Sequence, residues 1–238
     1  MSEVVLVHGS CHGAWCWRDV APALERLGHD VRTIDLPGHG TNPCPLEDIT
    51  LDRYAQAILD AIKSRALVVG HSMAGFPISA AAEIDPSKIA RLIYLCAYAP
   101  RDGVSLVDMR MEAPRQPLLE AIEKTPDGLG FTFRETHLAK ALYHDCPEGT
   151  AAYAHANLCV QAIKPQATPI RLGAAYAEVP KTYIRCDDDQ AIPPEYQRTM
   201  TEDWPAKAVH ALPASHSPFF SMPDRLARLI DRIARGTS

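Results

Sequence analysis

The sequence predicts an α/β fold in which a mostly parallel sheet of about six strands is flanked by helices. Its 238 residues fit one large domain, and 47% of them are hydrophobic, which is enough for a single deep core. Short apolar runs recur without polar alternation, as expected for strands covered on both faces. The early runs begin roughly thirty residues apart, the spacing of repeated βαβ units. The predicted strands are Val4–Val7, Val31–Leu36, Leu67–Val69, Leu92–Cys96, Thr182–Ile184 and Ala208–Leu212.

Helical periodicity fills the spaces between several of these strands. Apolar residues recur with helical spacing at Val20, Leu24 and Leu27, which predicts a helix after the first strand. Two longer patterns predict a helix before the third strand and another at the carboxyl end, where Ser221 is a candidate N-cap. These patterns are Leu51, Tyr54, Ile58 and Ile62, and Leu226, Leu229, Ile230 and Ile233.

The regular alternation stops near residue 101 and resumes near residue 179. Residues 102–178 contain scattered prolines and glycine-containing turns, and helices are predicted at His137–His144 and Ala151–Ile163. We interpret this stretch as a mainly helical cap, inserted before the strand that carries the predicted acid, into a single domain whose core comprises residues 1–101 and 179–238. The cap is expected to cover the crevice at the carboxyl ends of the strands, where open α/β sheets bind ligands.

Composition excludes several classes of protein. Lys and Arg number 24 against 29 acidic residues, a formal net charge of -5 without blocks of like charge, so nucleic acid is not an expected partner. The longest uncharged stretch, Ala66–Ala82, is interrupted by polar residues, so no membrane segment is predicted. Seven cysteines without a C-x-x-C pair favour neither a disulfide framework nor a zinc site; most are expected to be buried, and no metal or cofactor is expected. The first residues do not form a signal peptide, which favours a cytoplasmic location.

The stretch Ala66–Ala82 also contains the most informative motif. An apolar strand leads into G-H-S-M-A-G at residues 70–75, and a helix of small residues follows. This pattern resembles the nucleophile elbow of α/β-hydrolases, a sharp turn that projects a serine hydroxyl, here that of Ser72, at a helix N-terminus. Gly70 would let the strand and the helix approach closely, and Ala74 departs from G-x-S-x-G by one methyl group. The alternative is an ordinary turn with a capping serine.

A serine nucleophile needs a base, and His216 is the best-placed candidate. It follows the last predicted strand and precedes the terminal helix, which places it in a loop at the carboxyl edge of the sheet. It also follows the serine in the chain, as the base of α/β-hydrolases does. A purely structural histidine is the alternative. The other candidates are less suitable because they lie within a strand or in the cap: His210, His137, His144 and His155.

Three consecutive acidic residues end the strand at 181–186, and one of them is expected to orient His216. Hydrolases of this fold commonly place the acid in a D-x-x-I/V-P turn, so the resemblance implies Asp189. Asp102, which follows the preceding strand, is the rival because some members of the fold use that position. The acids at 187–189 could instead form a cation site or a solvated turn, although they lack the spacing and glycine of a calcium loop.

The oxygen that becomes negative when a serine attacks a carbonyl needs backbone N–H donors. The resemblance implies that the amides of Ser10 and Met73 face this oxygen, and that Gly9 allows a tight backbone path after the first strand. The alternative is that His8 and Gly9 simply end that strand.

A longer resemblance begins at the first strand. The sequence V-H-G-S-C-H-G-A-W-C-W at 7–17, followed by L-E-R-L-G-H at 24–29, resembles the family of plant methylesterases and hydroxynitrile lyases, which bacterial esterases share. The similarity extends through the elbow, Asp189 and His216, and it implies an α/β-hydrolase fold. The segment Asp35–Gly40 departs from the plant pattern and resembles α/β-hydrolases in general.

Two positions separate the chemistries of this family. Cyanohydrin-cleaving members carry threonine after the first histidine and lysine after the catalytic histidine, whereas this chain has Gly9 and Ser217. Without that lysine no evident cation stabilises departing cyanide, which favours hydrolysis of a small apolar carboxylic ester through an acyl-enzyme. The alternatives are hydroxynitrile lyase-like or other C–C cleavage on the same triad, and a non-catalytic ligand receptor on this fold.

Substrate contacts are predicted at Gly9, His12, Phe219 and Phe220, which lie close to the predicted oxyanion loop or the base. The two phenylalanines could equally pack the cap onto the core. The expected partner is a small-molecule ester, and the protein is expected to be a monomer or a homodimer.

Overall fold

A six-stranded sheet forms the centre of the molecule in the computed structural model, which describes residues 1–236. The strand order is β2-β1-β3-β4-β8-β9, and every adjacent pair runs parallel. The predicted α/β fold with a mostly parallel sheet of six strands is therefore confirmed. The strands are β1 (Glu3–Val7), β2 (Asp30–Ile34), β3 (Ala66–His71), β4 (Ile89–Leu95), β8 (Lys181–Cys186) and β9 (Val209–Leu212).

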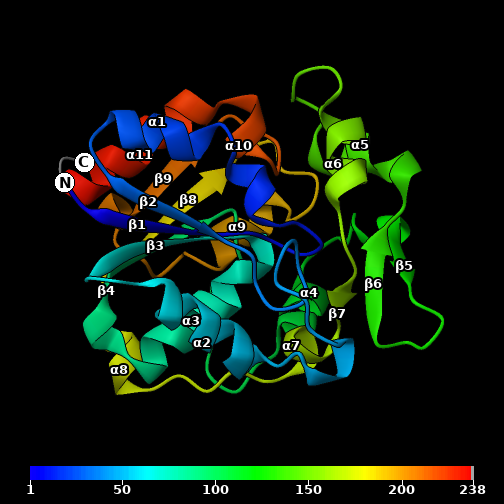
Figure 1. Cartoon of the computed structure of the whole chain (residues 1–238), viewed down its shortest axis with the longest axis horizontal. Helices are drawn as coiled ribbons and strands as arrows, with labels where there is room; N and C mark the ends of the chain where they lie inside the picture. The colour runs from blue at the N-terminus through cyan, green and yellow to red at the C-terminus, as the bar shows by residue number, and fades with distance from the viewer. Residues whose placement is uncertain (237–238) are drawn as a thin grey trace.

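Helices cover both faces of this sheet (Figure 1). Helices α1 (Val20–Arg26) and α11 (Pro223–Arg235) pack together on one face, and α2 (Leu51–Ala61) and α3 (Gly75–Ile84) on the other. A hydrophobic core fills the space between the sheet and the helices on each face. In β1, Val4 and Leu6 belong to the core beside α1 and α11, and Val5 and Val7 belong to the core beside α2 and α3. Because side chains on both faces are buried, the strands read as continuous apolar runs.

The cap follows β4 and lies beyond the carboxyl ends of the strands, except for its last helix, which packs against α3 near the amino end of β8 (Figure 1). Both termini lie at that amino end of the sheet. Helices make up most of the regular secondary structure of the cap, but it also contains a three-stranded antiparallel sheet, β5-β6-β7, which the sequence did not predict. The helices are α4 (Leu106–Glu112), α5 (Glu135–Leu142), α6 (Thr150–Asn157), α7 (Lys164–Ala167) and α8 (Ala174–Glu178), and the strands are β5 (Ile122–Lys124), β6 (Gly130–Phe133) and β7 (Gln161–Ala162).

Two helix boundaries differ from the prediction. The helix expected over Ala151–Ile163 ends at Asn157, because the chain turns into β7 and pairs with β6. Ser221 is not the N-cap of the terminal helix: it ends the short helix α10 (Pro218–Ser221), and Met222 precedes Pro223 at the start of α11. The remaining helices are α9 (Pro194–Thr199) and the 3-10 turns η1 (Ala14–Trp17), η2 (Leu46–Asp48), η3 (Ser72–Ala74), η4 (Pro86–Lys88), η5 (Leu119–Ala121) and η6 (Ala206–Ala208).

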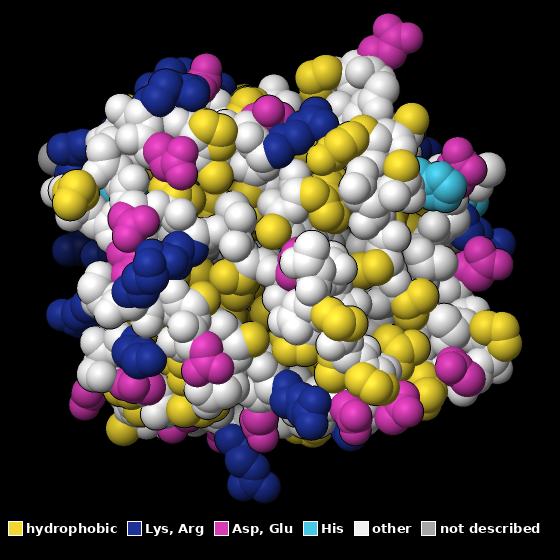
Figure 2. Space-filling model, viewed as in Figure 1, with side chains coloured by type: hydrophobic (Ala, Val, Ile, Leu, Met, Phe, Trp, Pro, Cys, Tyr) yellow, Lys and Arg dark blue, Asp and Glu magenta, His cyan; other side chains and the backbone are white. Residues whose placement is uncertain are grey.

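Acidic and basic side chains are interspersed on the face shown in Figure 2, and hydrophobic side chains lie among them. None of the helices within residues 1–236 combines the length and the apolar composition that a membrane crossing requires. All seven cysteines are free thiols, and the four that are fully buried are Cys11, Cys16, Cys96 and Cys186.

Candidate active site

Ser72 stands at the sharp turn between β3 and α3. Its φ of 56° lies in the left-handed region, which is strained for a residue with a Cβ. Close packing around the turn explains the small residues beside it. A Cβ at Gly70 would lie 2.9 Å from the Ala74 carbonyl oxygen, and a Cβ at Gly75 would overlap the Tyr98 carbonyl oxygen. The sequence around Ser72 therefore permits a backbone conformation that larger residues would prevent.

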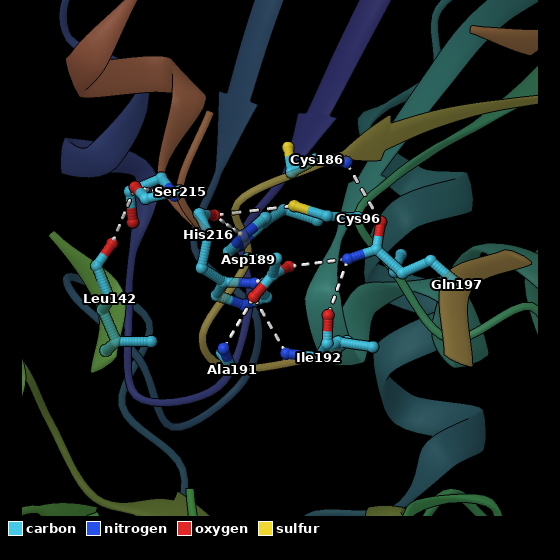
Figure 3. A network of polar contacts seen from close by, with 12 residues as sticks. Cys96, Leu142, Cys186, Asp189, Ala191, Ile192, Gln197, Ser215 and His216 are labelled. Atoms are coloured by element: carbon cyan, nitrogen blue, oxygen red, sulfur yellow. Dashed lines mark hydrogen bonds and ion pairs between the residues drawn. The ribbon is translucent and has the colours of Figure 1, made fainter. Parts of the chain in front are cut away.

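His216 and Asp189 lie in contact at the same edge of the sheet (Figure 3). Nδ1 of His216 is 2.7 Å from Oδ2 of Asp189, and both side chains are buried. Oδ1 of Asp189 accepts the backbone N–H groups of Ala191 and Ile192, at 2.7 and 2.9 Å. Oδ2 also accepts a hydrogen bond from Nε2 of Gln197 at 2.8 Å. The carboxylate is thus held by four donors and has one orientation relative to the imidazole.

Gln197 was not predicted to belong to the site. It lies on α9, eight residues after Asp189, and is fully buried. Its Oε1 accepts the backbone N–H of Cys186, and its Nε2 donates to Asp189 and to the carbonyl of Ile192. The side chain therefore ties the end of β8 to the turn that carries the carboxylate. The sequence signal that could have located Gln197 is the helix that begins directly after I-P at 192–193.

The neighbouring carboxylates have other partners. Oδ1 of Asp102 accepts the backbone N–H of Leu172 at 2.8 Å, and Asp102 is exposed. Asp187 pairs with Arg185, and Asp188 lies 3.0 Å from the ring of His144. Of the acids at 187–189 together with Asp102, only Asp189 contacts His216 within the described residues, and the three consecutive carboxylates do not converge on a common point.

His71, directly before Ser72, holds the loop that carries His216. Its Nε2–H donates to the backbone carbonyl of His216 at 2.8 Å, and the centroids of the two rings are 4.5 Å apart. Burial lowers the pKa of His71 well below its ordinary value, and the nearby His216 and His12 act in the same direction. His71 is therefore a neutral donor that fixes the backbone of His216.

The buried thiol of Cys96 also lies against the His216 carbonyl, at 3.5 Å. Within residues 1–236, donor atoms of His71, Cys96 and His216 lie within 4.8 Å of one another. Since Nε2 of His71 and Sγ of Cys96 are both directed at that carbonyl, the cluster holds the His216 loop and does not present three free ligands to an ion.

Ser72 directly follows His71, whose Nε2 bonds the His216 carbonyl, so the elbow lies beside the loop that carries His216. Within residues 1–236, no hydrogen bond joins the Ser72 hydroxyl to the His216 ring. Such bonds are often long before substrate binds, and the pairing of Ser72 with His216 stays a prediction. The other candidate bases lie elsewhere: His210 is in β9, and His137, His144 and His155 are in the cap.

The loop after β1 passes very close to the elbow. A Cβ at Gly9 would lie 2.7 Å from Nδ1 of His71 and 3.0 Å from Cβ of Ser72. Ser10 is therefore beside Ser72, while Met73 follows it in the chain. The hydroxyl of Ser10 accepts a hydrogen bond from Nε2 of Gln166 on α7, at 2.9 Å. The assignment of the Ser10 and Met73 amides as oxyanion donors stays a prediction.

The predicted substrate-contact residues form an aromatic cluster under the cap. His12 donates from Nδ1 to the Ser10 carbonyl and lies 2.6 Å from the hydroxyl of Tyr143, and burial lowers its pKa to about 4. Phe219 is fully buried, with its ring 4.9 Å from those of His71 and Phe220. These side chains pack the interior of the site in this structure, and contact with substrate stays a prediction for them.

Polar side chains of the cap attach it to the loops of the core. Gln161 of β7 is fully buried; its Nε2 donates to the hydroxyl of Tyr54, and its Oε1 lies 3.2 Å from Nε2 of His39. Asp145 accepts the backbone N–H of Ser215 at 2.8 Å. The cap is therefore fixed to the core on both sides of the site.

Comparisons with known proteins agree with this architecture. The sequence model of the Alpha/beta hydrolase family matches residues 4–229. Methylesterase 7 of Arabidopsis thaliana is 34% identical over 252 residues, covering 98% of this chain and 96% of the relative. The pyrethroid hydrolase of Sphingobium wenxiniae is 31% identical, covering 97% and 86%. The crystal structure of a pyrethroid hydrolase from Sphingobium faniae JZ-2 superposes with a TM-score of 0.88 at 30% identity, covering 98% of this chain and 97% of the other.

Proposed function

Since the chain belongs to the alpha/beta hydrolase family and is an ester hydrolase, we propose that it cleaves a small carboxylic ester through an acyl-enzyme on Ser72. The observation that carries this proposal is the contact of His216 with a carboxylate, Asp189, that is buried and held by four donors, beside a serine with a strained backbone. This arrangement of base and orienting acid is the one that nucleophilic catalysis by serine requires.

In the proposed reaction, the Ser72 oxygen attacks the ester carbonyl carbon while His216 accepts the serine proton. Asp189 keeps the Nδ1–H of His216 directed away from the serine, so that Nε2 is the basic atom. The amides of Ser10 and Met73 stabilise the negative oxygen of the tetrahedral intermediate. The intermediate collapses, and the alcohol leaves with the proton from His216. Water then attacks the acyl-enzyme by the same route and releases the acid.

The proposal is tested with a panel of methyl, short-acyl and aryl esters, extended with lactones and cyanohydrins. The Ser72→Ala variant is expected to lose at least about 10⁴-fold in kcat on every ester that is hydrolysed, because the nucleophile is removed. Ser87→Ala is the matched control, since Ser87 is exposed in η4 at the far end of the sheet. Undiminished hydrolysis by Ser72→Ala contradicts the proposal.

The same panel separates the alternatives. Release of aldehyde or ketone from cyanohydrins, without hydrolysis of any ester, would identify lyase chemistry. Tight binding of an ester without turnover would identify a receptor.

A further inference from the structure

A cavity of about 390 Å³ lies between α4, α7 and the small sheet of the cap. Apolar side chains, among them Val107, Phe131 and Ile163, form most of its wall. The polar side chains that line it are Arg110, Lys124 and Gln166, and among the described residues no carboxylate lines it. The cavity therefore combines apolar walls with a positive charge at one side, and its volume suits a small organic molecule.

One residue of the cavity wall connects the cavity to the loop beside the predicted nucleophile. Gln166 donates to the hydroxyl of Ser10 at 2.9 Å. Ser10 follows Gly9, at which a Cβ would lie 3.0 Å from Cβ of Ser72. The cavity wall therefore reaches the loop that passes beside the elbow.

Arg110 differs from the other arginines around α4. Arg101 pairs with Glu112 at 2.6 Å, and Arg115 pairs with Glu195 at 2.6 Å. Within residues 1–236, Nε of Arg110 is buried and has no hydrogen-bond partner, and its guanidinium has no carboxylate partner. Burying an N–H donor of a charged group without a partner costs free energy, so the site is incomplete without an acceptor.

An ionised carboxylate is the acceptor that fits this guanidinium best. The planar fork of arginine matches the two oxygens of a carboxylate, and a charged pair is strengthened by the apolar surroundings of the cavity. We propose that Arg110 binds a free carboxylate of the substrate, so that the preferred substrates are half-esters of dicarboxylic acids with an apolar spacer. This inference rests on the proposed function, because it assigns the substrate class of the same site.

The test compares a charged and a neutral ester that share the same scissile group. Monomethyl adipate carries a free carboxylate, whereas dimethyl adipate does not. The wild-type protein is expected to hydrolyse the monoester with the higher kcat/KM. Arg110→Met is expected to lower kcat/KM for the monoester about 10- to 100-fold, the range expected for a hydrogen bond to a charged group. The same variant should change kcat/KM for the diester less than about threefold, since methionine keeps an unbranched apolar stem without the charge.

Two further variants separate a specific contact from general charge. Lys124→Met removes the other cation of the cavity, which is exposed, and is expected to reduce the preference less than about fivefold. Arg26→Met removes an arginine that is exposed on α1 and pairs with Asp224 outside the site, and it should leave both esters unchanged. An equal loss on both esters in Arg110→Met, or a wild-type preference for the diester, would overturn the inference.

Binding is measured separately from turnover, so that failure of the proposed function is distinguishable. Monomethyl adipate is titrated by calorimetry into two proteins, the Ser72→Ala variant and the double variant Ser72→Ala/Arg110→Met. We expect Kd to rise about 10- to 100-fold on replacement. No binding, or equal Kd values, would overturn the inference. If the wild-type protein hydrolyses neither ester but the Kd values differ as expected, the carboxylate site stands and the proposed function fails for these esters.

Discussion

The core side and the cap side of the site are built in different ways. On the core side, Asp189 accepts four hydrogen bonds and the carbonyl of His216 is held by His71, so these groups have little freedom. On the cap side, Gln166 donates one hydrogen bond to Ser10, and Nε of Arg110 has no partner within the described residues. Under the proposed mechanism, the core would fix Asp189 and His216 in advance, whereas the cap would leave the guanidinium of Arg110 for the substrate.

The largest effect is expected when the carboxylate of Asp189, on the core side, is replaced. Asp189→Asn is expected to lower kcat about 10³- to 10⁴-fold, because an amide favours the wrong tautomer of His216. Asp102→Asn is the matched control: Asp102 is exposed and bonds only the N–H of Leu172 among the described residues, so kcat should change less than about threefold. Steady-state kinetics on an activated ester measure kcat for both variants. An equal loss in the two variants would show that Asp189 has no special role.

A smaller effect is expected at the loop that faces the elbow. In Gly9→Ala the new methyl group would meet His71 and Ser72, so the loop must move and carry the Ser10 amide with it. We expect kcat to fall about 10²-fold, the lower end of the loss for one oxyanion donor.

The matched control for this loop is Gly28→Ala, measured by the same kinetics and by urea unfolding. Gly28 has a φ of 90° and open space around it, so the substitution strains the backbone away from the site. It is expected to lower the free energy of unfolding by about 1 kcal/mol and to leave kcat unchanged. If Gly9→Ala keeps full kcat, the oxyanion assignment is wrong.

The buried ring of His12 gives the stability of the protein a pH dependence. Burial lowers the pKa of His12 from 6.5 to about 4, so the folded protein keeps this ring neutral while the unfolded chain protonates it below about pH 6.5. Stability is therefore full above pH 6.5 and falls as the pH drops towards 4. For His12 alone, the free energy of unfolding should be about 2 kcal/mol lower at pH 5 than at pH 8. Urea titrations at the two values measure the difference.

Replacing one histidine in the core and one in the cap isolates the contribution of His12 to this pH dependence. His12→Gln should reduce the loss of stability between pH 8 and pH 5, because the group that titrates is removed. His155→Gln should leave the loss unchanged, since His155 is exposed in the cap. Equal pH dependence in the wild-type protein and His12→Gln would contradict the assignment of a buried neutral ring.

The sequence predicted the core better than the cap, and the reason is physical. Strands buried on both faces leave continuous apolar runs, so all six strands of the main sheet could be located. The strands of the cap are two to four residues long and are defined by pairing with distant segments, as Gln161 of β7 pairs with Phe131. Local patterns do not contain that information, which is why a helix was predicted across β7.

The same contrast holds for the site. Ser72 and Asp189 occur in short motifs, and His216 could be located by its place between the last predicted strand and the terminal helix. Gln197 and Arg110 act through tertiary contacts, one with the carboxylate of Asp189 and one with a cavity, and they carry no motif. The sequence predicted a small apolar ester, whereas the fold leaves the buried Nε of Arg110 without a hydrogen-bond partner within residues 1–236.

The central claim is that the core side presents an activated Ser72, and covalent trapping tests it most directly. The protein is incubated with an aryl alkylphosphonate, which transfers its phosphonyl group to an activated serine, and is then digested for peptide mass spectrometry. We expect one adduct per chain, on the peptide that contains Ser72, and none in Ser72→Ala or after unfolding in urea. An unmodified Ser72 in a protein that hydrolyses esters, or an adduct on another residue, would contradict the account.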